Sequence, residues 1–178
     1  MKIRRYEPGD LAQITALFYD TVHAVNAADY SPEQLDAWAD GAPDEDRWNR
    51  SLLAHHSLVA VEDGGLIVGF GDIDGAGYLD RLYVHRDRQG RGVATALLDR
   101  LERAVDAPVL TTHASLTARP FFERRGYRVL REQRVERRGV WMTNDVMEKR
   151  REGAAFRKTG AKRGLTGGKT LLEYIRTE

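Results

Sequence analysis

Cysteine is absent from the 178-residue sequence. Its absence excludes disulfide bonds, thiolate zinc sites and a cysteine nucleophile, and it is compatible with a reducing compartment. No apolar run approaches the ~20 residues that a membrane-spanning helix needs, and the basic N-terminal residues are not followed by the apolar stretch of a secretory signal. We therefore expect a cytoplasmic protein with no membrane partner.

An excess of charge of one sign is also missing. The 28 lysine and arginine residues nearly balance the 27 aspartate and glutamate residues, and the formal net charge is +1. Without a strong overall field, a nucleic acid is an unlikely partner. The length fits one domain with its own core, followed at most by a tail.

The composition changes near residue 150. Residues 151–170 are rich in glycine, lysine and arginine, which is typical of a flexible basic segment. We expect a folded domain over 1–150 and a basic, flexible C-terminal tail over 151–178. The tail could bind an anion or simply be solvated; a nucleic-acid-binding role would depend on it and would be sensitive to salt.

Alternation and helical spacing of apolar residues predict an α+β order of short elements. The expected strands are 2–6, 57–62, 66–73, 78–85, 109–112, 127–134 and 140–148. The expected helices follow Asp10 and Ser31 as N-caps, surround Trp48, run over 90–104, and extend from Ser115 to a stop at Gly126. No internal repeat is visible.

One glycine-rich segment, Gln89-Gly90-Arg91-Gly92-Val93-Ala94, follows a predicted strand directly and opens a predicted helix. Free backbone N–H groups and the positive end of the helix dipole converge at such a point, which suits a phosphate group. Glycines there let the backbone approach the ligand closely. The alternative is an ordinary glycine-rich turn; the segment is neither a P-loop nor a dinucleotide fingerprint.

The segment resembles the Gln/Arg-x-x-Gly-x-Gly/Ala signature of GNAT acetyltransferases, in which this turn binds the pyrophosphate of acetyl-CoA. Residues 3–10 resemble the first strand and helix entry of the family, 82–85 its strand before the motif, and 118–127 its A-x-x-F-F/Y-E-x-x-G-F/Y segment. More narrowly, residues 30–38 and 138–144 resemble the bacterial YafP-like subgroup. The resemblance covers about residues 1–150.

The resemblance implies a GNAT fold: a mixed, mostly antiparallel sheet of about seven strands, splayed at its centre, with helices on both faces. It also implies that an acetyl group passes from acetyl-CoA to a primary amine of a small molecule or peptide by direct attack, without a metal ion. A homodimer is possible. In the splay, the backbone of Tyr83 and Val84 would bind the pantetheine and the carbonyl. The implied cofactor-binding residues are Leu82, Tyr83, Val84, Gln89, Gly90, Arg91, Gly92, Val93, Ala94, Thr95, Ser115 and Phe122.

Two residues are candidates for the general base. Alternation along the strand predicts that Tyr78, Asp80, Leu82 and Val84 share one face, where Asp80 could accept a proton through water. Asp80 could instead be an ion-pair partner of a neighbouring arginine. His113 could also act as the base, because its ordinary pKa is near neutrality, or it could be structural.

The general acid usual in the family is missing, because many GNAT enzymes carry a tyrosine where this sequence has Phe122. Tyr83, Tyr127 or water could protonate the thiolate, or the thiolate could leave without an acid. The missing hydroxyl also leaves open a second function, that of a non-catalytic acyl-CoA-binding sensory module.

By the same resemblance, the first helices and the loop between them line the substrate pocket. We expect Tyr30, Trp38 and Trp48 there, together with Tyr78, because aromatic rings can cover a planar amine or bind a cation. Trp38 and Trp48 could instead pack the helices onto the sheet. Aspartates nearby could attract a cationic substrate or be solvated, namely Asp29, Asp36 and Asp40.

Overall fold

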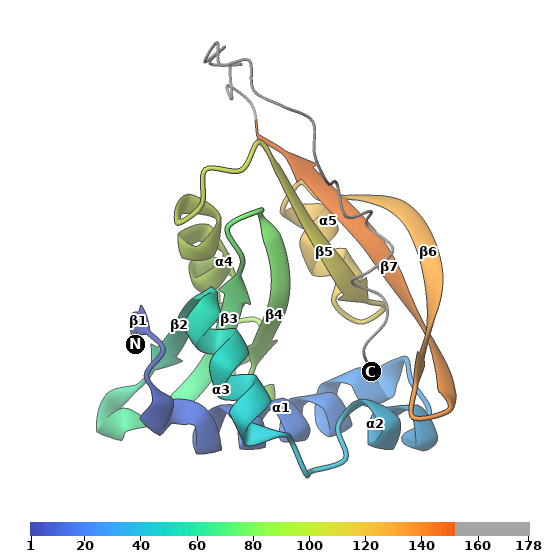
Figure 1. Ribbon diagram of the computed structural model, residues 1–178, viewed down its shortest axis with the longest axis horizontal. Coiled ribbons are helices and arrows are strands. Elements are labelled where there is room, and N and C mark those ends of the chain that lie inside the picture. Colours follow the sequence, from blue (N-terminus) through green and yellow to red (C-terminus); the bar gives the residue numbers. More distant parts are fainter. Residues whose placement is uncertain (152–178) are drawn as a thin grey trace, which may run out of the picture.

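The computed structural model describes residues 1–151, which form a seven-stranded mixed sheet with helices on both faces (Figure 1). The strand order is β1-β2-β3-β4-β5-β7-β6, and β4 and β5 form the parallel pair. The strands are β1 (Lys2–Arg5), β2 (His56–Val61), β3 (Ile67–Ile73), β4 (Tyr78–Val84), β5 (Val109–Ser115), β6 (Arg128–Arg137) and β7 (Val140–Arg150). The main helices are α1 (Leu11–Val25), α2 (Pro32–Trp38), α3 (Glu45–Ala54), α4 (Val93–Arg103) and α5 (Arg119–Arg124). The expected α+β fold is confirmed.

Strand alternation divides the core between the two faces of the sheet. In β2, Leu58 and Ala60 pack with the apolar face of α4, whereas Val59 packs with α1 and α3. A third cluster joins α2 to β7 through Leu35 and Met142. Within residues 1–151, no helix is long and apolar enough to cross a membrane.

The sheet is splayed at its centre. The parallel pairing of β4 and β5 covers only Tyr78 with Thr111 and Leu79 with Thr112. Beyond these pairs the two strands diverge, and Figure 1 shows the V-shaped opening between them. From Asp80 onwards, the side of β4 that faces β5 therefore has no strand partner, as expected for this fold.

A β-bulge in β4 overturns one expectation. Asp72 of β3 pairs with Arg81 and Ile73 pairs with Leu79, so Asp80 is an extra residue in β4. An extra residue reverses the alternation of side chains along the strand. The prediction that Tyr78, Asp80, Leu82 and Val84 share one face is therefore wrong: Leu82 and Val84 join Leu79 on the α4 face.

Two predicted N-caps act differently from the expectation. The Asp10 side chain does not cap α1; it accepts a hydrogen bond from the Glu7 N–H (2.9 Å) and pairs with the Arg4 guanidinium (2.6 Å). Ser115 is the last residue of β5, and its hydroxyl accepts a hydrogen bond from the Ala118 N–H (3.1 Å). Ser115 thus closes the turn that precedes α5.

The predicted tail, 151–178, lies outside the described residues except for Arg151. The Arg151 N–H donates to the Pro108 carbonyl (3.0 Å), and its guanidinium donates to the Val105 carbonyl (2.6 Å). We expect removal of 152–178 to change the melting temperature by less than ~2 °C, which corresponds to about 0.5 kcal/mol. Truncation after Lys149 should cost several degrees, because two hydrogen bonds of about 1 kcal/mol each are lost.

Thermal unfolding of both truncated proteins tests this boundary. A large loss of stability on removing 152–178 alone would show that the folded unit extends beyond Arg151.

Candidate active site

The glycine-rich turn has the geometry that its sequence predicts. Gly90 and Gly92 have φ of +70° and +79°, a region that favours glycine, and α4 begins at Val93. A Cβ atom at either glycine would meet nothing within 4 Å. Because the first N–H groups of a helix lack intrahelical partners, the turn presents donors to open space.

Gln89 closes this turn with its side chain. Its amide nitrogen donates to the Val84 carbonyl (2.7 Å), which also accepts a bond from the Thr21 hydroxyl (3.3 Å). One hydrogen of the Gln89 side-chain amide is thereby used within the protein.

A cavity of about 550 Å³ fills the splay between β4 and β5 and extends to the glycine-rich turn. Its lining includes every predicted cofactor-binding residue except Arg91, which is exposed beside the turn. It also includes Asp80 and His113. The fold thus brings together residues that the sequence separates by about 40 positions.

The backbone of β4 divides its polar groups between β3 and the splay. The His85 N–H donates to the Val68 carbonyl (2.9 Å), and a Cβ on Gly69 would lie 3.2 Å from the Tyr83 carbonyl oxygen. Antiparallel pairing alternates these directions, so the Tyr83 backbone faces β3. The backbone N–H and carbonyl groups of Leu82 and Val84 therefore point into the splay. The predicted ligand contact from the Tyr83 backbone is not supported by this geometry.

A second cavity, of about 1060 Å³, lies on the α1 side of β4. Residues of α1, α3, the segment 39–45 and the β6–β7 turn line it. Trp38, Asp80 and Tyr83 line both cavities. These three residues therefore mark the junction between the two cavities.

Of the predicted substrate residues, Trp38 and Trp48 line the second cavity, whereas Tyr30 and Tyr78 line neither cavity. Trp48 also packs against Phe18 (ring centroids 5.0 Å apart), so the packing alternative holds for it as well. Tyr78 contacts the His113 ring edge-on, with centroids 5.4 Å apart. Tyr78 is therefore a neighbour of the first cavity.

Tyr30 has a structural position. Its hydroxyl donates to the Thr143 carbonyl (2.7 Å) and accepts a bond from the Leu116 N–H (3.0 Å). The ring is buried against Trp38. Because both hydrogen-bonding directions of the hydroxyl are used, the sequence-based expectation of a substrate contact is not supported.

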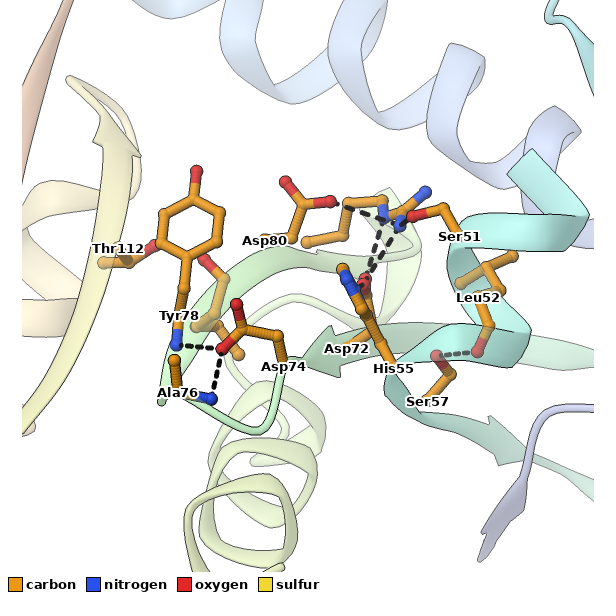
Figure 2. Close-up of polar contacts among 12 residues, drawn as sticks. Ser51, Leu52, His55, Ser57, Asp72, Asp74, Ala76, Tyr78, Asp80 and Thr112 are labelled. Atoms are coloured by element: carbon orange, nitrogen blue, oxygen red, sulfur yellow. Dashed lines mark hydrogen bonds and ion pairs between the residues drawn. The ribbon is translucent and has the colours of Figure 1, made fainter. Parts of the chain in front are cut away.

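Asp80 belongs to a polar network on the α3 side of β4 (Figure 2). Its carboxylate lies 3.2 Å from the Arg81 guanidinium, which also forms a two-pronged bond with buried Asp72 (2.8 and 3.0 Å). The His55 ring nitrogen contacts Asp72 at 2.6 Å. Burial raises the pKa of Asp80, and the charge of Arg81 opposes this rise. The expected ion-pair alternative for Asp80 is thus present geometrically, with Arg81 as its partner.

The two inner members of this network, His55 and Asp72, were not predicted from the sequence. Their ligand atoms and that of Asp80 lie within 4.8 Å of one another, a spacing that can suit a metal ion. However, the Arg81 guanidinium already bridges Asp72 and Asp80. We therefore interpret the cluster as an ion-pair network. A lone aspartate in the apolar strand β3 is the signal that could have identified it.

His113 lines the first cavity but not the second. Burial lowers the pKa of its imidazole, so the neutral ring could accept a proton. Gln133 lies near it, with 3.5 Å between the amide nitrogen and Nδ1. Of the two candidate bases, Asp80 is the one that reaches the junction.

The tyrosines considered as proton donors occupy different places. The Tyr127 hydroxyl donates to Glu102 (3.1 Å), and Tyr127 lines neither cavity. Tyr83 lies at the junction beside Trp38, and burial raises the pKa of its hydroxyl. The Tyr83 hydroxyl is therefore protonated at neutral pH, whereas buried Phe122 offers only a ring.

Comparisons with known proteins agree with this arrangement. A model of the acetyltransferase (GNAT) domain matches residues 26–150. The uncharacterised N-acetyltransferase YafP of Escherichia coli (strain K12) is 40% identical over 147 residues, which cover 83% of this chain and 94% of that protein.

Solved structures show the same fold. A GCN5-related N-acetyltransferase from Rhodopseudomonas palustris is 38% identical, with a TM-score of 0.80 over 84% of this chain and 94% of that chain. PaiA N-acetyltransferase from Thermoplasma acidophilum, in complex with coenzyme A, has a TM-score of 0.67 at 16% identity, over 84% and 98% of the respective chains. The chain belongs to the GNAT family of N-acetyltransferases.

Proposed function

We propose that the protein transfers an acetyl group from acetyl-CoA to a primary amine by direct attack at the junction of the two cavities. The observation that carries the proposal is that Trp38, Asp80 and Tyr83 line both cavities. A donor in the splay and an acceptor on the α1 side of β4 would meet there. The PaiA structure, which has the same fold, is a complex with coenzyme A, and this supports coenzyme A as the ligand that we propose here.

On the donor side, the turn at Gly90 and Gly92 would bind the pyrophosphate through backbone N–H groups and the positive end of α4. The pantetheine would extend along β4, whose free edge begins at the bulge. Leu82 and Val84 would supply backbone hydrogen bonds there. The thioester would then lie close to Asp80.

On the acceptor side, the raised pKa of Asp80 suits a general base, because its carboxylate takes a proton more readily than an ordinary aspartate. The ammonium proton passes to Asp80, directly or through water, and the neutral amine attacks the thioester carbonyl. The carbon–nitrogen bond forms, the attacking nitrogen loses its second proton, and the carbon–sulfur bond breaks. The thiolate takes up one proton, which is either relayed from the nitrogen through the Tyr83 hydroxyl or exchanged with solvent. Holding both reactants at one junction supplies the proximity that the reaction needs.

Two measurements on the purified protein test the proposal. Acetyl-CoA at about 100 times its Kd should stabilise the native state by about 2.7 kcal/mol, which raises the melting temperature by roughly 5–10 °C. A panel of amines should then release coenzyme A. Because the chain has no cysteine, a thiol reagent would report coenzyme A without a protein background.

The same two measurements distinguish the acetyltransferase from the second proposed function. A non-catalytic acyl-CoA-binding sensory module would show the stabilisation without thiol release from any amine. The position of Phe122, which offers no hydroxyl to the first cavity, is the observation that favours this alternative.

A further inference from the structure

Arg137, at the end of β6, lines the second cavity and makes no hydrogen bond or ion pair with any residue in 1–151. The other arginines of the cavity differ. Arg81 is bound by Asp72, Arg138 is paired with Asp40, and Arg47 also has a partner. The cavity thus has one guanidinium with no counterion among the described residues.

The alternation of side chains along β6 determines the face on which the Arg137 side chain lies. Val135 packs into the cluster under α1 and α2, and Arg137, two residues further, shares that face of the strand. This face borders the second cavity. Burial raises the pKa of Tyr83 and of Asp80, and the charge of Arg137 opposes the rise at both. The positive charge of Arg137 therefore acts on the junction between the two cavities.

Five acidic residues line the same cavity, and none of them forms a hydrogen bond or ion pair with Arg137. Asp40 is paired with Arg138, and the Asp44 side chain accepts a bond from the Arg47 N–H (3.0 Å) as the N-cap of α3. Asp20 and Glu45 are exposed, and Asp80 lies at the junction, where the amine would bind. The sequence-based idea that Asp40 attracts a cationic substrate is therefore not supported.

We propose that the acceptor is an aminocarboxylate and that Arg137 binds its carboxylate while Asp80 receives its amine. This inference rests on the proposed function. A guanidinium suits a carboxylate because its planar fork can donate two parallel hydrogen bonds. The same charge repels a second ammonium group, so a diamine or polyamine is disfavoured. The rings of Phe18, Trp38 and Trp48 also line this cavity and favour an acceptor with an apolar side chain.

Turnover with matched acceptors provides the first test. Glycine, leucine, methionine and phenylalanine are each compared with their carboxamides, which keep the amine and the side chain but lose the negative charge. For at least one pair we expect kcat/KM of the acid to exceed that of the amide at least fivefold. Arg137→Gln should bring this ratio within twofold of one, mainly through KM, and Arg137→Lys should restore part of it.

Arg134→Gln is the matched control. It removes one positive charge from the same strand, but Arg134 lies on the opposite face, over the Trp141 ring at 5.5 Å. For Arg134→Gln, the ratio of kcat/KM between acid and amide should equal that of the wild type. A wild-type ratio near one for every pair, or a ratio that Arg137→Gln leaves unchanged, would overturn the proposal.

A binding experiment tests the carboxylate site without depending on turnover. Calorimetry with coenzyme A present compares each N-acetylamino acid with its carboxamide. We expect tighter binding of at least one acid, lost in Arg137→Gln. If coenzyme A binds but no acceptor is acetylated, the proposed function fails. The binding experiment then tests by itself whether Arg137 binds a carboxylate. Equal binding of acids and amides would reject the carboxylate site.

Discussion

Replacing Asp80 with asparagine should lower turnover by 10² to 10⁴, the range for a lost general base. The substitution is nearly isosteric and replaces the carboxylate, which accepts the proton and pairs with Arg81, by an uncharged amide. It should leave the affinity for acetyl-CoA within about twofold, because the expected cofactor contacts come from the backbone of Leu82, Val84 and the glycine-rich turn. Steady-state kinetics and calorimetry measure the two effects separately.

The prediction for Asp80 also includes the direction in which activity changes with pH. Burial raises the pKa of Asp80, so activity of the wild type should fall as the pH drops through this raised value. The deficit of Asp80→Asn should shrink as the pH rises, because more of the amine is then already deprotonated. A pH profile of kcat/KM for both proteins tests this pattern.

Stability separates catalysis from a structural role. A carboxyl group whose pKa is raised in the folded state destabilises that state when it is ionised, so Asp80→Asn should not lower the melting temperature at neutral pH. Arg81 keeps its bonds to Asp72 in the variant. A lower melting temperature with unchanged turnover would instead identify Asp80 as an ion-pair partner, and His113→Gln would become the next variant to measure.

Gly92→Val should weaken acetyl-CoA binding by about 10- to 100-fold, or ~1.4 to 2.8 kcal/mol. The Cβ would project into open space, so no protein atom is displaced. The branched side chain would instead occupy the region where we propose the pyrophosphate binds. Isothermal titration of acetyl-CoA measures the loss.

Backbone strain must be separated from this effect, because Gly92 has a φ of +79°. Such strain costs on the order of 1–3 kcal/mol for a residue with a side chain. Gly64→Val is the matched control: Gly64 has a φ of +81°, also meets nothing within 4 Å, and lies in the β2–β3 turn. Both variants should lose similar stability. Equal acetyl-CoA affinity in the two variants would contradict the proposed phosphate site.

Local signals in the sequence predicted most of the fold. Ser31 and Gln34 form the expected reciprocal capping bonds at the start of α2, and Gly126 has the positive φ expected at the stop after α5. Each signal depends on residues within a few positions, whose conformational preferences are nearly independent of the rest of the chain. The glycine-rich turn belongs to the same class.

Long-range pairing decided what the sequence did not reveal. The bulge at Asp80 exists only relative to β3, so inspection of β4 alone could not show that the side chains change faces there. Tyr30 is similar, because its hydrogen-bonding partners lie 86 and 113 positions away. Recognising Arg137 as unpaired also required the positions of the aspartates around it.

The splay between β4 and β5 also bears on aggregation. An exposed strand edge is a template for pairing with another chain, and proteins often protect such edges with charged side chains. The outer edges of this sheet, β1 and β6, both carry arginines. The inner edge of β4 is protected differently, because it lies inside a cavity of about 550 Å³. We therefore expect these unpaired backbone groups to be less available to a strand of a neighbouring protein than the outer edges are.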